Sequence, residues 1–110
     1  MSLDTSQLAK DMMNAIQGVL SEKWPKIKDY GEAESKKLAD AIAKVEKLKL
    51  QHKIDDEEAR LQFNIQKNAS RTVLLTIEGL GEIAAEEAIN AAMNVVKDTV
   101  NTALGFTLIK

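Results

Sequence analysis

Apolar side chains recur at helical spacing along most of the 110 residues, and they are densest between Val73 and Leu104. This stretch is rich in alanine and leaves only a narrow polar stripe. Its core-type seam consists of Val73, Ile77, Leu80, Ala84, Ala88, Ala91 and Val95. More apolar residues flank the seam, so the apolar face is wider than one partner helix can cover. We therefore expect this helix to contact neighbours on several sides.

Two helices are predicted before the helix that contains this alanine-rich stretch. Asp4 is a suitable N-cap, which starts a first helix of about 5–23. Trp24 continues one of its two apolar rows, and Pro25 then removes a backbone donor, which predicts a kink or a short break. The next helix, about 26–53, has a narrower stripe of coiled-coil type, formed by Leu38, Ile42, Val45 and Leu48.

The clearest local signal is the start of the third helix. Asp55 is a suitable N-cap, and Glu58 three residues later completes a capping box. The helix should then run over about 55–104, because the seam keeps its phase across Gly79-Leu80-Gly81 and no other turn-forming residue accompanies the glycines. A break at Gly79, giving four helices, is the alternative.

These elements predict a single all-helical domain over residues 1–110, with a short apolar tail at 105–110. A turn is expected at about His52–Ile54, between the second and third helices. The segments before and after this turn have similar lengths, which favours a long antiparallel helical hairpin with a Pro-kinked first arm. An arm of roughly 50 residues would span about 75 Å and leave the alanine-rich face wet. We therefore expect a dimeric helical bundle. The alternative is a monomeric four-helix bundle broken at Gly79–Gly81.

Composition supports an all-α chain. Hydrophobic residues make up 45% of the sequence but aromatic residues only 4%, and there is one proline. Cysteine is absent, which excludes disulfides, thiolate metal sites and cysteine nucleophiles. Residues 1–3 lead directly into an amphipathic segment, so no signal peptide is visible and a cytoplasmic location is the default expectation.

The formal net charge is −2, but the two halves of the chain differ in sign. Residues 23–53 hold nine lysines and five acids, whereas residues 55–110 hold five basic and nine acidic residues. Halves of opposite sign suit each other better than they suit nucleic acid, and no arginine or aromatic cluster accompanies the lysines of the second helix. Glutamates between 78 and 87 interrupt the apolar run, so no transmembrane segment is expected.

Residues with catalytic or metal-binding potential are few. Bundle metal sites combine facing glutamates with a Glu-x-x-His pair, which this chain lacks. His52 is the single histidine and lies near the predicted turn. Gly79-Leu80-Gly81 lacks the remaining residues of a phosphate-binding loop. We therefore predict no enzyme activity and no catalytic, cofactor or metal site.

The pattern favours a non-enzymatic structural or protein-interaction module that self-associates through its alanine-rich helix. The predicted interface consists of Val73, Ile77, Leu80, Ala84, Ala88, Ala91, Val95 and Trp24. A homo-oligomer, most simply a dimer, is expected, and an unidentified protein partner could meet the charged faces or the apolar tail. The alternative is a carrier or surface binder of an apolar ligand, lipid or granule that uses the same face.

Overall fold

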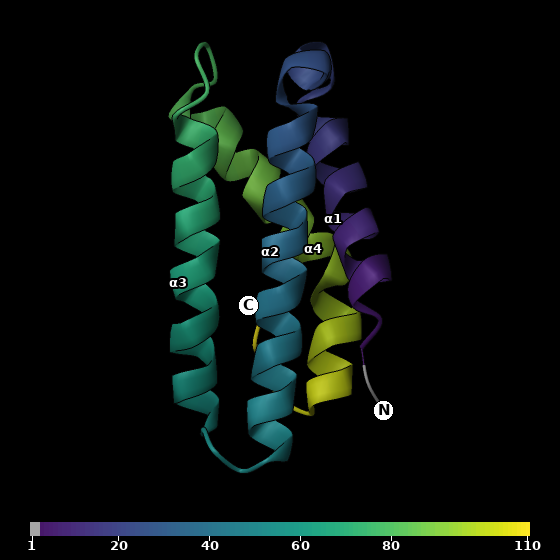
Figure 1. Ribbon diagram of the computed structural model, residues 1–110, viewed down its shortest axis with the longest axis vertical. Helices are drawn as coiled ribbons and strands as arrows, with labels where there is room; N and C mark the ends of the chain where they lie inside the picture. The colour runs from purple at the N-terminus through teal and green to yellow at the C-terminus, as the bar shows by residue number, and fades with distance from the viewer. Residues whose placement is uncertain (1–2) are drawn as a thin grey trace.

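The computed structural model describes residues 3–110 and is all-helical (Figure 1). Its helices are α1 (Thr5–Val19), α2 (Trp24–Leu50), α3 (Asp56–Leu75) and α4 (Glu82–Leu104), with a short 3-10 turn at Ser21–Lys23. Met1 and Ser2, part of the segment considered for a signal peptide, lie outside the described residues. The all-α class predicted from the sequence is confirmed.

Helices begin where the capping residues place them. The Asp4 side chain accepts a hydrogen bond of 3.0 Å from the Gln7 amide, and α1 starts at Thr5. The capping box of α3 is complete, because Asp55 and Glu58 each accept from the other's backbone amide. Pro25 lies in the first turn of α2, where its missing donor costs nothing. The break between α1 and α2 comes before it, at the 3-10 turn Ser21–Lys23, so α1 ends at Val19 and not at about residue 23.

The continuous helix predicted over residues 55–104 is wrong. α3 ends at Leu75, and α4 begins only at Glu82. Within the turn, Gly79 has φ +84°, a conformation that glycine adopts without strain, and the Lys23 ammonium donates to its carbonyl. The helical spacing of apolar residues continues through the turn because Leu80 is buried there by tertiary packing. An apolar residue at this position therefore does not require a helix.

The long hairpin is not present either. α2 and α3 are antiparallel neighbours, and α1 packs along both α2 and α4. In Figure 1, α4 crosses obliquely behind α2, so the second arm doubles back over the first. The chain measures 43 × 22 × 19 Å, far short of a 75 Å arm. A break at Gly79–Gly81 gives the four-helix alternative within one chain, whereas a dimer stays a prediction.

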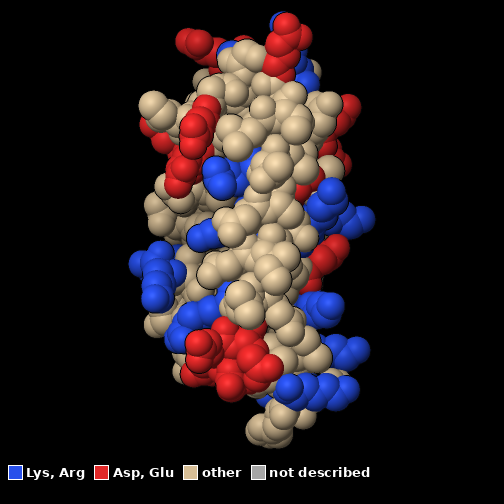
Figure 2. Space-filling model, turned by 90° about the vertical axis from the view of Figure 1, so that its left-hand side faces the viewer, with Lys and Arg blue, Asp and Glu red and all other residues tan. Residues whose placement is uncertain are grey.

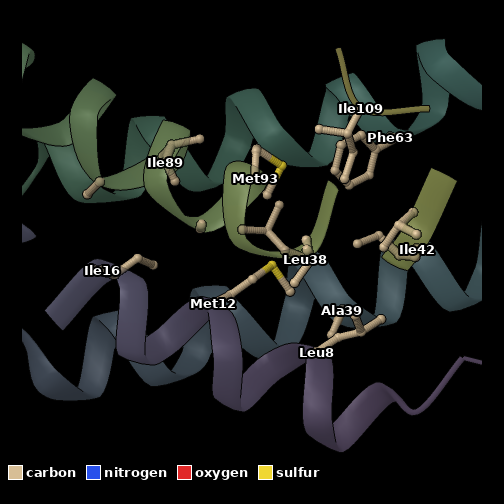
Figure 3. Packing of buried hydrophobic residues seen from close by; sticks show 14 of the residues in the cluster. Leu8, Met12, Ile16, Leu38, Ala39, Ile42, Phe63, Ile89, Met93 and Ile109 are labelled. Carbon is tan, nitrogen blue, oxygen red and sulfur yellow. The ribbon is translucent and has the colours of Figure 1, made fainter. Parts of the chain in front are cut away.

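Side chains from all four helices meet in one core (Figure 3). Met12 and Ile16 of α1 are fully buried, as are Leu38 of α2 and Ala88 of α4, and Phe63 of α3 is 1% exposed. Burial of each large aliphatic or aromatic side chain stabilises the fold by about 1.5–3 kcal/mol. The small alanines of α4 allow α1 to approach closely. Most of the apolar face of α4 is therefore covered by its own chain, whereas Ile83 and Val95 stay 76% and 50% exposed.

The apolar tail docks on its own chain. Gly105 has φ +75° and ends α4 in the left-handed conformation typical of helix C-termini. The Asn101 side chain then accepts hydrogen bonds from the amides of Leu108 and Ile109 and donates to the Ile109 carbonyl. Both apolar residues are only 4% exposed, and Ile109 reaches the ring of Phe63 (Figure 3).

Phe106 packs the same tail against α2 and α3, near the turn that joins them. Its ring centroid lies 4.9 Å from the Lys49 ammonium of α2 and 5.5 Å from the Arg60 guanidinium of α3. The Arg60 Nε also donates to the Thr107 carbonyl at 2.7 Å. The tail therefore joins α2 and α3 near the turn between them, in addition to its hydrogen bonds to α4.

Candidate functional site

Most of the outward side of α3 is uncharged, and the two charged residues between Leu61 and Thr76, Lys67 and Arg71, are half-buried. Between Leu61 and Thr76 every exposed residue is uncharged, and these nine residues, here called the α3 face, are Leu61, Gln62, Asn64, Ile65, Asn68, Ala69, Thr72, Leu75 and Thr76. On α2, by contrast, most exposed residues are lysine, aspartate or glutamate. The α3 face therefore differs from the charged surface that usually keeps a helix solvated.

Large apolar side chains lie within this face. Leu61 and Ile65 are each 64% exposed, and Leu75 is 37% exposed. Figure 2, which views the molecule from the side of α3, shows uncharged surface along much of the long axis, interrupted by a few basic side chains, with acidic side chains gathered toward both ends. Single exposed apolar residues are ordinary, but a row along one helix makes the α3 face a candidate contact surface.

α3 has apolar residues on two opposite sides, and the α3 face is the side that does not pack against the core. Ala59, Phe63, Ser70 and Leu74 are buried against the core, and they lie about half a helical turn from the exposed row. The outward row alternates between spacings of four and three, which is the a/d pattern of a coiled coil. Its members, here called the outer seam, are Leu61, Ile65, Asn68, Thr72 and Leu75.

The borders of the outer seam carry few charges. Along one border, Glu57, Asn64 and Arg71 follow each other at intervals of seven residues, so they lie in one line on the helix. Glu57 is exposed and Arg71 is half-buried. On the other border, Gln62 and Ala69 are uncharged. This line has an acid at one end, an amide in the middle and a base at the other end. When two copies of the line run in opposite directions, the acid of each lies opposite the base of the other.

A shallow hollow extends the face toward α2. Its volume is about 600 Å³, and its lining includes Gln62, Ile65 and Gln66 from α3 together with Ala41, Val45 and Leu48 from α2. Lys37, Asp40 and Lys44 also line it, so apolar surface gives way to charges of both signs on the α2 side. The uncharged surface is thus widest around Ile65.

The predicted interface residues do not form an open surface. Leu80 and Ala88 are buried and Val95 is 50% exposed, while the remaining members are half-buried: Trp24, Val73, Ile77, Ala84 and Ala91. Self-association through these residues stays a prediction. It was expected because the alanine-rich face was thought to be uncovered, and this reason is wrong because α1 packs along α4. Ala88 is 0% exposed, so it belongs to the core and not to an open surface.

The α3 face was not predicted from the sequence. Its signal was present in the spacing of Leu61, Ile65 and Leu75, but these residues were hidden beside the inward row that contains Phe63. Only the structure shows which of the two rows is inward.

Other kinds of site find little support. Among residues 3–110, no group of three or more histidine, cysteine or acidic side chains is arranged to hold a metal ion. Within the same residues, no helix combines the length and apolar character that a membrane crossing requires. His52 is exposed in the α2–α3 turn with φ +56°. No known protein family, curated protein or solved structure matches this chain.

Proposed function

We propose that the protein is a non-enzymatic interaction module that self-associates, and that its contact surface is the α3 face. The observation that supports this proposal is that all nine exposed residues from Leu61 to Thr76 are uncharged, in a chain of which 29% is charged. The two charged residues of this stretch, Lys67 and Arg71, are half-buried. A helix face that meets only water gains solubility from charged residues, whereas a contact surface excludes them from its centre. The α3 face replaces the alanine-rich helix as the proposed interface.

Association through this face would be reversible. Contact would remove Leu61 and Ile65 from water, and burial of such side chains contributes about 1.5–3 kcal/mol each. However, the 20 residues of α3 extend only about 30 Å, and stable complexes usually bury about 1,600 Å² in total. Asn68 and Thr72 also interrupt the apolar row. We therefore expect a monomer–dimer equilibrium with a Kd in roughly the micromolar range or weaker.

Sedimentation velocity tests this proposal. Over protein concentrations from about 1 μM to about 1 mM, the wild-type mass should rise from 12.1 kDa toward twice that value. Ile65→Lys places a charge at the centre of the α3 face, so this variant should remain at the monomer mass. Ala33→Lys is the matched control, because Ala33 is exposed on α2 and its replacement should leave association unchanged.

Circular dichroism should show that both variants keep the wild-type helix content. A wild-type protein that stays monomeric at the highest concentration would contradict the proposal. So would an Ile65→Lys variant that associates as strongly as the wild type.

A further inference from the structure

We infer that two copies pair α3 against α3 in antiparallel orientation, about a two-fold axis that passes between Leu61 and Ile65 and beside Asn64. This inference rests on the proposed function and specifies its partner, a second copy of this chain. The observations that carry it are the line Glu57, Asn64 and Arg71 along the border of the outer seam, and the position of the two most exposed apolar residues of α3.

Charge pairing favours the antiparallel orientation. When the line is reversed about Asn64, each Glu57 lies opposite Arg71 of the second copy, and the symmetry forms this ion pair twice. A parallel pair in register would instead place the two Glu57 side chains at one level and the two Arg71 side chains at another. An axis at Asn68, the middle of the outer seam, would leave Glu57 and Arg71 unpaired. The charges therefore select both the orientation and the register.

Apolar packing favours the same axis. With the axis between them, Leu61 of each copy faces Ile65 of the other, which is the a-to-d contact of antiparallel coiled coils. These two side chains are the most exposed apolar residues of α3, at 64% each, so this register covers the largest apolar area at the centre of the contact. Antiparallel helices also align their macrodipoles favourably.

Single cysteines test the orientation cleanly, because the chain contains none. Asn64→Cys and Gln62→Cys lie beside the axis, so each should form a disulfide-linked dimer under oxidising conditions. Asn68→Cys and Thr72→Cys should not, because two-fold related copies of these positions lie about 15 Å and about 27 Å apart along the helix. A disulfide requires Cα atoms within about 7 Å. All four residues are exposed, uncharged and polar, which makes them matched controls for one another.

A parallel pair would give the reverse result. Asn68 and Thr72 lie in the outer seam and would meet their own copies, so cross-linking at 68 and 72 would overturn the inference. If the wild type dimerises but only these two variants cross-link, the orientation fails and the proposed function survives. If the wild type shows no self-association in sedimentation, both fail.

Charge reversal tests the register independently. Glu57→Arg and Arg71→Glu should each weaken dimerisation roughly tenfold at low salt, because each converts two attractive contacts into repulsive ones. The double variant should return to within about threefold of the wild type. Equal losses that add in the double variant would overturn the register. Helix content measured by circular dichroism separates a loss of pairing from a loss of folding, and the cysteine variants test the register without changing either charge.

Discussion

Asn101 should contribute more to stability than other polar residues of α4, because its side chain holds the C-terminal tail. It accepts from the amides of Leu108 and Ile109 at 2.9 and 3.0 Å and donates to the Ile109 carbonyl at 2.8 Å. Asn101→Ala removes all three hydrogen bonds and leaves partly buried backbone groups unpaired. A hydrogen bond contributes about 0.5–1.5 kcal/mol net, so the three together predict a loss of about 1.5–4.5 kcal/mol.

Release of the tail does not lower this loss. Detachment would expose Leu108 and Ile109, which costs about 1.5–3 kcal/mol each and together at least as much as the three hydrogen bonds. Urea denaturation followed by circular dichroism measures the change in the free energy of unfolding. Asn90→Ala is the matched control, because Asn90 is an exposed asparagine of the same helix, and it should change stability by less than about 0.5 kcal/mol.

A chain that ends at Gly105 separates the tail contact from any effect on the helix. There Asn101→Ala should cost less than about 0.5 kcal/mol, because the groups that Asn101 binds are gone. An equal cost in the full and shortened chains would refute the reasoning, as would a full-length loss no larger than that of Asn90→Ala.

Glycine substitutions give two further predictions, both measured by thermal unfolding. Gly31→Ala should destabilise by about 1–3 kcal/mol, because its Cβ would lie 2.8 Å from the Trp24 ring, whereas Gly18→Ala meets open space within α1 and should stabilise by about 0.5–1 kcal/mol. Equal effects would contradict this packing. Gly79→Ala should cost about 1–2 kcal/mol because of φ +84°, and Gly79→Asn should cost less because asparagine tolerates that conformation. If neither substitution at residue 79 lowered the stability, the result would contradict the left-handed conformation of Gly79 in the turn between α3 and α4.

Local signals predicted the starts of α1 and α3 but not the start of α4. The caps at Asp4 and Asp55 depend on residues within one turn, so the sequence alone located the beginnings of α1 and α3. The break at Gly79 was not predicted, because a periodic apolar pattern reports burial and does not distinguish a helix from a turn that packs into the core. Leu80 is buried in that turn and preserves the spacing.

The candidate site depended on information that is not local. Ile65 and Phe63 are both large and apolar and lie two residues apart, so they must point in different directions on one helix. Which one is inward is decided by α2, α4 and the tail, and the tail places Ile109 against Phe63. The sequence could therefore show that α3 is apolar on more than one side, but not which side is left for a partner.

Backbone amide chemical shifts recorded during dilution of isotope-labelled protein test the central claim most directly, because they report both whether the chain associates and where. We expect shifts that change with concentration to concentrate in residues 57–76 and the adjacent rim of α2, while the buried face of α4 stays constant. Changes centred on α4, or shifts that stay constant up to about 1 mM, would contradict association through the α3 face.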